Sequence, residues 1–157
     1  MSKNEVRVLG SISQPRLQRL NLDSNKINSL EGFVGLDCKS LRQLILSNNR
    51  LTSLEGLREL PVLEELYLAS NEIKSLRGLG GFKKLKKLHL RGNKFTGFDF
   101  VPMLDTVEYL NLRDNQIETQ PEAGGPGSSG SEQLAKLGEY DEENAKFCFH
   151  SLTKLHM

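Results

Sequence analysis

The chain has 157 residues, a length that suits one domain with an appendage. Its hydrophobic content of 37% and charged content of 26% are those of an ordinary soluble protein. A formal net charge of +1 does not favour nucleic-acid binding, and no apolar run approaches the roughly 20 residues of a membrane-spanning helix.

The two cysteines, Cys38 and Cys148, are too few for a disulfide framework. The N-terminal sequence MSKNEVRVLG also lacks an apolar segment of signal-peptide length. We therefore expect an intracellular protein with reduced thiols and no membrane insertion.

Five copies of one pattern, L-x-x-L-x-L-x-x-N-x-I, run through the chain. They begin at Leu17, Leu41, Leu63, Leu85 and Val107. Self-similarity at such a period marks stacked structural repeats, each of which buries its apolar face against its neighbours. The asparagines of the pattern stand 24, 22, 22 and 22 residues apart, at Asn25, Asn49, Asn71, Asn93 and Asn115.

This pattern is the leucine-rich repeat signature. The 22-residue period with I/L-x-S-L-x-G-L resembles the intracellular repeats of Sds-type phosphatase regulators, of an axonemal dynein light chain and of the spliceosomal A-prime protein. The resemblance implies an α/β fold: a leucine-rich repeat solenoid with a curved parallel sheet on its concave face and short α or 3₁₀ turns on its convex face. Those relatives bind unrelated partners, so the resemblance indicates no particular partner.

Before the first repeat, residues 1–16 resemble the end of a repeat whose beginning is missing. Val6, Leu9 and Ile12 approximate the apolar spacing that follows each asparagine, and we expect them to cover the N-terminal edge of the sheet. The first repeat carries two extra residues between Gly32 and Leu41. This insertion is predicted to bulge on the convex side without disturbing the strands.

Within a repeat, Leu66 and Leu68 are predicted to point inward and Tyr67 outward, the period of two of a strand. Asn71 is predicted to turn the chain and to satisfy backbone groups of adjacent turns. The glycines of the connecting segments are expected where the backbone needs room or a positive φ; they are Gly32, Gly56 and Gly78.

The outward strand positions define the concave face. Ile45, Tyr67 and Tyr109 are apolar or aromatic there, where a solvated sheet needs only polar residues. Together with arginines they have the composition of a protein-binding patch, although single exposed apolar residues are also normal on protein surfaces. The candidate partner-binding residues are Ile45, Tyr67, His89, Arg91, Tyr109, Asn111 and Arg113.

After the repeat domain (residues 1–120), residues 121–131 have the composition of a flexible linker, and their abrupt start resembles an engineered joint, with a natural loop as the alternative. In the tail, residues 132–157, Asp141 resembles a helix start. Five apolar residues would share one face of the helix predicted to follow: Ala145, Cys148, Phe149, Leu152 and Leu155. That face would lie either in the concave groove, as a tethered peptide ligand, or over the last repeat, as a substitute cap.

No serine or cysteine stands in a convincing arrangement with a base, and the cysteines and histidines lack metal-site spacing, so neither an enzyme nor a cofactor is expected. The basic run Lys83–Lys87 lacks the aromatic interleaving of single-strand binders. We therefore predict a monomeric, non-catalytic module that recognises a helical or extended peptide on its concave face, with its own residues 132–157 as one candidate. The alternative, from resemblance alone, is a regulatory or targeting subunit of an enzyme or motor complex.

Overall fold

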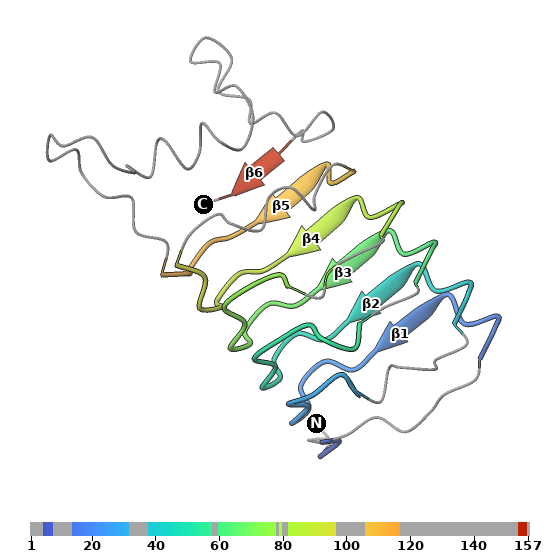
Figure 1. The fold of residues 1–157 in the computed structure, drawn as a ribbon, viewed down its shortest axis with the longest axis horizontal. Coiled ribbons are helices and arrows are strands. Elements are labelled where there is room, and N and C mark those ends of the chain that lie inside the picture. Colours follow the sequence, from blue (N-terminus) through green and yellow to red (C-terminus); the bar gives the residue numbers. More distant parts are fainter. Residues whose placement is uncertain are drawn as a thin grey trace, which may run out of the picture.

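The computed structural model describes residues 5–7, 14–31, 38–57, 60–77, 79, 82–96, 106–116 and 154–156. They form a stack of short parallel strands joined in sequence order into one sheet (Figure 1). The strands are β1 (Arg19–Asn21), β2 (Gln43–Ile45), β3 (Glu65–Tyr67), β4 (Lys87–His89), β5 (Tyr109–Asn111) and β6 (Lys154–His156).

The strands pair in one constant register. The middle residue of each strand stands beside the middle residue of the next: Leu20, Leu44, Leu66, Leu88, Leu110 and Leu155. Because Arg19 pairs with Gln43 as Glu65 pairs with Lys87, the two extra residues of the first repeat do not shift the ladder. The predicted parallel sheet is confirmed.

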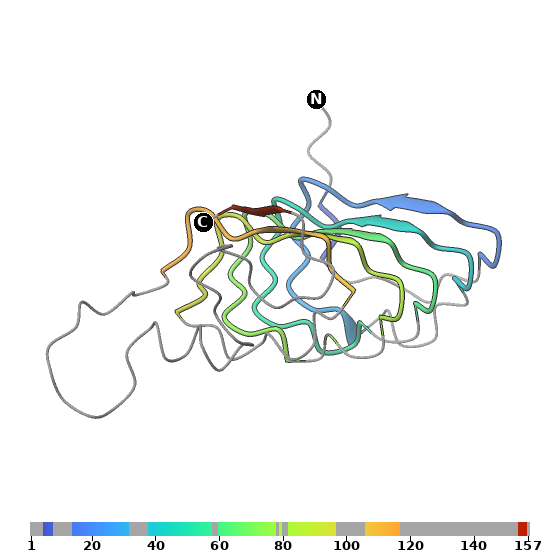
Figure 2. The same cartoon turned by 90° about the horizontal axis from the view of Figure 1, so that it is seen from above.

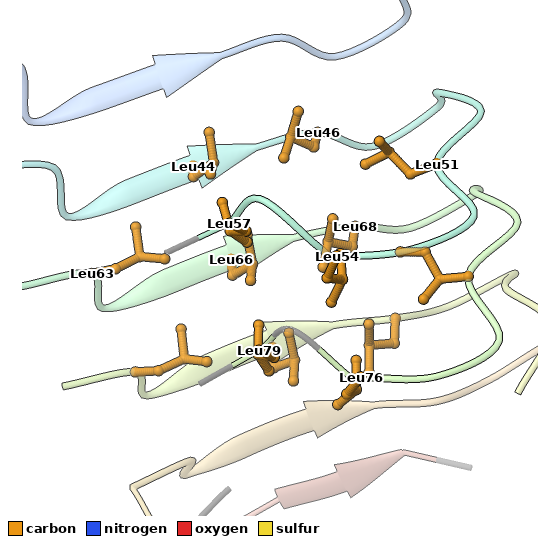
Figure 3. Close-up of a cluster of buried hydrophobic side chains, with 14 of the residues drawn as sticks. Leu44, Leu46, Leu51, Leu54, Leu57, Leu63, Leu66, Leu68, Leu76 and Leu79 are labelled. Carbon is orange, nitrogen blue, oxygen red and sulfur yellow. The ribbon is translucent and has the colours of Figure 1, made fainter. Parts of the chain in front are cut away.

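The core lies on one side of the sheet and consists almost entirely of leucine (Figure 3). In β3, Leu66 is fully buried while its neighbours Glu65 and Tyr67 are half-buried, as the period of two requires. Residues of the connecting segments, such as Leu54 and Leu76, close the core from the other side. Consequently the face of the sheet turned away from the core, the concave face of the sequence analysis, is the one that solvent and partners can reach.

The described parts of the connecting segments on the convex side contain isolated turns (Figure 2). Hydrogen bonds between residues three positions apart close single turns, for example from Leu57 N–H to Leu54 O at 3.0 Å and from Leu79 N–H to Leu76 O at 2.9 Å. The described residues contain no α-helix, and none of their segments could span a membrane. Among the described residues the convex side therefore shows single turns of this kind, and the stretches 32–37, 58–59, 80–81 and 97–105 lie outside the described residues.

Asparagine side chains hold neighbouring repeats together, as predicted. Asn71 is 6% exposed, its Oδ1 accepts from the Leu51 N–H at 3.0 Å, and its Nδ2 donates to Leu46 O and Leu68 O at 3.0 Å each. Asn49, Asn93 and Asn115 make the same bonds one repeat away. The ladder thus satisfies buried backbone groups that no strand reaches.

The residue before each asparagine takes a left-handed backbone conformation. Its φ lies between 55° and 67° in all five repeats, at Ser24, Asn48, Ser70, Gly92 and Asp114. This conformation reverses the chain from the strand into the convex segment. Glycine, asparagine and aspartate tolerate this conformation locally, whereas at the two serines the ladder and the core impose it.

Residues 5–7 form the second half of an incomplete repeat at the N-terminal end. The Val6 N–H donates to Asn25 Oδ1 at 3.3 Å, and Val6 O accepts from the Lys26 N–H at 3.1 Å. These are the contacts that Ile73 makes with Asn93 and Lys94 further along the array. The backbone of Val6 thus occupies the place that Ile73 has in the third repeat, with its side chain 36% exposed, whereas Leu9 and Ile12 lie outside the described residues.

At the C-terminal end, the helix prediction is wrong for residues 154–156. These residues form β6, which adds to the edge of β5 in parallel (Figure 1). They therefore do not lie across the concave face, as the tethered-ligand placement required. Residues 117–153, with Ala145, Cys148, Phe149 and Leu152, lie outside the described residues.

The sequence holds a signal for β6 that the helical interpretation overlooked. Residues 152–157 read Leu-Thr-Lys-Leu-His-Met, which repeats the opening L-x-x-L-x-L of the signature with methionine in the last place. The fourth repeat has Leu-Lys-Lys-Leu-His-Leu at 85–90. Leu155 follows Leu110 by 45 residues, compared with 22 from Leu88 to Leu110, so 23 additional residues precede this strand half of a sixth repeat.

Candidate binding face

The concave face carries one apolar and aromatic row across its centre. Strand pairing places Ile45 beside Tyr67, Tyr67 beside His89 and His89 beside Asn111, and all four side chains are half-buried. Parallel strands are about 4.8 Å apart, so equivalent side chains of consecutive repeats lie in contact distance. The register therefore places the predicted binding residues Ile45, Tyr67, His89 and Asn111 side by side.

Three aromatic rings of this face pack against one another. The rings of Tyr67 and His89 are stacked, with centroids 4.4 Å apart and an angle of 15° between their planes. The ring of Tyr109, which belongs to the adjacent row, lies 4.8 Å from that of His89 at 34°. Tyr67, His89 and Tyr109 form the aromatic stack. Its side chains offer large, pre-ordered contact area, which is what binding hot spots contain.

A charged cluster that sequence reasoning did not single out supports the aromatic stack. The Glu65 carboxylate accepts hydrogen bonds from Tyr67 Oη at 3.0 Å, from Lys87 Nζ at 2.8 Å and from Gln43 Nε2. The sequence contains a signal for this cluster, because the opposite charges of Glu65 and Lys87 stand one 22-residue repeat apart, as do Gln43 and Glu65. Since Tyr67 donates its hydroxyl to Glu65, its ring orientation is fixed before any partner arrives.

The cluster shifts the pKa values of its members in the directions expected for an ion pair. The hydrogen bond from Lys87 lowers the pKa of Glu65, against an opposing contribution from burial and with further help from Gln43 and Tyr67. Burial, followed by the nearby Glu65 carboxylate, raises the pKa of the Tyr67 hydroxyl. Tyr67 is therefore a neutral hydrogen-bond donor at physiological pH.

Replacing Glu65 by glutamine is expected to make folding stability less sensitive to acid. The folded-state pKa of Glu65 lies below its ordinary 4.5, so its contribution is present above that pH and is lost as the pH falls further. Between about pH 6 and pH 3 the Glu65→Gln variant should lose less free energy of unfolding than the wild type. The difference should be less than about 1 kcal/mol, because the pair is partly exposed, and it should appear as a smaller fall in melting temperature. Circular dichroism melts measure this difference; parallel pH profiles of the two proteins would contradict it.

The predicted arginines lie beside the stack and are exposed. Arg91 Nε donates to Asp114 Oδ2 at 2.6 Å, and the two side chains are 62% and 61% exposed. Arg113 occupies the equivalent position one repeat further and is also exposed, while the Asn111 Oδ1 accepts from its backbone N–H at 3.1 Å. The structure thus brings every predicted binding residue onto one continuous face, with Ile45 at one end and Arg113 at the other.

Groups for covalent or metal chemistry do not gather on this face. Within the described ranges, histidine, cysteine, aspartate and glutamate form no cluster that could hold a metal ion. Cys38 is buried in the core with a free thiol, on the opposite side of the sheet.

Comparison with known families agrees with the architecture. Models described as leucine rich repeat match residues 15–73 and 105–120, and a model described as leucine rich repeats (2 copies) matches residues 61–102. The chain is a leucine-rich repeat protein. These matches cover the five full repeats, whereas the strand half at residues 152–157 lies outside them. No curated protein sequence matches the chain significantly.

Two solved structures illustrate the fold of this leucine-rich repeat protein. An internalin (inlF) from Listeria monocytogenes superposes with a TM-score of 0.58 at 24% identity, over 69% of this chain and 34% of the internalin. The SNF/U2A′ complex of Drosophila melanogaster contains a chain that superposes with a TM-score of 0.56 at 27% identity, over 66% of this chain and 62% of that one. The present chain therefore spans about a third and about three-fifths of these two proteins.

Proposed function

We propose that this leucine-rich repeat protein is a non-catalytic protein-binding module that holds a partner segment on its concave face. The aromatic stack carries the proposal. Tyr67, His89 and Tyr109 are half-buried, pack against one another and face away from the core. The core does not need these rings, because the leucines on the other side of the sheet already fill it.

The resemblance to the SNF/U2A′ complex supports a binding role, since that structure is an assembly of proteins. An intracellular setting is part of the proposal and agrees with the free, buried thiol of Cys38. A regulatory or targeting subunit would use the same face and would differ only in the partner that it holds. Three-residue strands present side chains rather than a long edge, so the partner segment is recognised by side-chain contacts, in helical or extended form.

Replacing Tyr67 and His89 together by alanine is expected to abolish partner binding without unfolding the chain. Truncating central aromatic anchors typically costs 2 kcal/mol or more, which lowers affinity by about thirtyfold. Affinity purification with quantitative mass spectrometry would compare the wild type, this double variant and Glu55→Ala, an exposed residue of the convex side. Proteins recovered equally with all three baits would rule out the concave face as the binding site.

A further inference from the structure

We propose that the part of the concave face formed by β4 and β5 binds an acidic segment of the partner protein. This inference rests on the proposed function and adds the chemistry of the partner. The inference starts from the charged residues of one stretch in each repeat. This stretch runs from the first residue of the strand to the residue before the ladder asparagine, for example residues 65–70 in the third repeat. Those positions provide the whole outward surface of the sheet.

Charge is distributed unevenly along this surface. The three strands β1, β2 and β3 present one cation and two anions: Arg19, Asp23 and Glu65. The two strands β4 and β5 present three cations and one anion: Lys87, Arg91, Arg113 and Asp114. The overall net charge of +1 hides this asymmetry, because the two signs are separated along the array.

Strand β6 continues the backbone ladder beyond β5. Lys154 stands beside Tyr109 and His156 beside Asn111 in the same register as all preceding pairs. The inward residues of the fifth repeat are nearly fully buried, with Val107 at 1%, Leu110 at 2% and Leu112 at 3% exposure. Their equivalents in the first repeat, which has no strand before it among the described residues, are only partly buried: Leu17, Leu20 and Leu22. The positive region therefore lies within the array and not at a frayed end.

The existing ion pairs leave the cations able to bind a further carboxylate. Arg91 uses Nε for Asp114 and remains 62% exposed, and Lys87 uses one contact to Glu65 and remains 50% exposed. A guanidinium has five N–H donors and an ammonium has three, so each side chain can donate a hydrogen bond to a second carboxylate. Arg113 lies on the same face as the His89 and Tyr109 rings, and these two rings, 4.8 Å apart, supply an apolar contact beside the charged side chains.

A protein segment fits this region better than nucleic acid does. A phosphate backbone needs a continuous basic track, whereas here Glu65 and Asp114 interrupt the cations. An acidic peptide with an aromatic or aliphatic residue matches both components of the surface: its carboxylates meet Arg91, Arg113 and Lys87, and its apolar side chain meets the aromatic stack. Charge complementarity of this kind also speeds association and makes it salt-dependent.

The test is a selection from a random peptide display library against the full chain. We expect enriched peptides to combine acidic residues with an aromatic or aliphatic residue. Fluorescence anisotropy would then measure their affinity for the wild type, Tyr67→Ala, Arg113→Glu and the control Arg19→Glu, with a short single-stranded DNA as a second probe. Each of the first two variants should weaken binding about tenfold, and Arg19→Glu should weaken it less than about twofold. Thermal melts and the variant Arg113→Lys, which should keep most of the affinity, report on folding.

The outcomes separate this inference from the proposed function. If the selected peptides need Tyr67 but are neutral or basic, or if Arg113→Glu and Arg19→Glu have equal effects, the acidic-partner inference fails while the binding face stands. If no selected peptide depends on Tyr67 or Arg113, both fail. Tighter binding of the DNA than of the acidic peptides would overturn the choice of a protein segment.

Discussion

The variant Asn71→Ala is expected to be less stable than the wild type by about 3 kcal/mol, because it leaves buried backbone groups without partners. The Leu51 N–H loses its acceptor entirely when Oδ1 is removed. The carbonyls of Leu46 and Leu68 lose one donor each but keep a second, since Asn49 and Asn93 also donate to them. One orphaned N–H therefore accounts for most of the loss, and the two weakened carbonyls for the rest. Urea denaturation followed by far-ultraviolet circular dichroism suits this chain, which has no tryptophan.

Two other asparagines provide graded controls for Asn71. Asn111 lies on the concave face, where its Oδ1 accepts from the exposed Arg113 N–H, so Asn111→Ala should cost less than about 1 kcal/mol. Asn25 belongs to the ladder, but the hydrogen bond that its Oδ1 accepts from the Val6 N–H is long, at 3.3 Å, and only partly buried. Its replacement should therefore have an intermediate effect. Equal losses for Asn71 and Asn111 would show that water replaces the ladder bonds and that the buried amide is not decisive.

The positions that fill the core could be predicted from the sequence because each one is fixed by volume and periodicity. Leu66 and Leu68 are fully buried and Tyr67 faces outward, as the period of two required. The same holds for the register of Ile45, Tyr67 and His89, because a constant repeat length places equivalent residues side by side. These features depend on local pattern repeated many times, and repetition removes the ambiguity of any single copy.

The strand β6 could not be separated from a helix on local pattern alone. Leu152 and Leu155 are three residues apart, which suits one face of a helix and also the opening of the repeat signature. Pairing with β5 decides between the two, and that contact joins residues 45 positions apart. Such a non-local interaction is invisible to a periodicity count. Matching residues 152–157 against the repeat rather than against a helix would have given the correct strand.

The candidate site was predicted as a surface but not as a set of contacts. The outward rows gave Tyr67, His89 and Tyr109 their places, yet nothing in the sequence indicated that the Tyr67 hydroxyl donates to Glu65. That bond depends on the side-chain conformations that two adjacent strands allow. Likewise, serine, asparagine, glycine and aspartate all adopt the left-handed conformation before the ladder asparagines, so the assembled turn contributes to that conformation.

The second large effect is expected for Gly56→Ala, which should destabilise the chain by about 3 kcal/mol. Gly56 has φ of +96°, a conformation that costs a residue with a Cβ about 1–2 kcal/mol. In addition, a Cβ at this position would lie 2.4 Å from Leu30 O and 2.7 Å from Leu30 C, both backbone atoms of the preceding repeat. Relieving that overlap requires the two repeats to separate, and close-packed leucines resist such a shift.

Gly92→Ala is the matched control, because it shares the positive φ but not the close contact. Its φ is +67°, and a Cβ there would meet nothing nearer than 3.6 Å. We expect this variant to lose only about 1 kcal/mol, the conformational cost alone. The difference between the two glycine variants in urea denaturation would then measure how closely consecutive repeats must approach at Gly56 and Leu30. If the two variants lost the same stability, the repeats could separate at little cost and the contact with Leu30 would not limit their spacing.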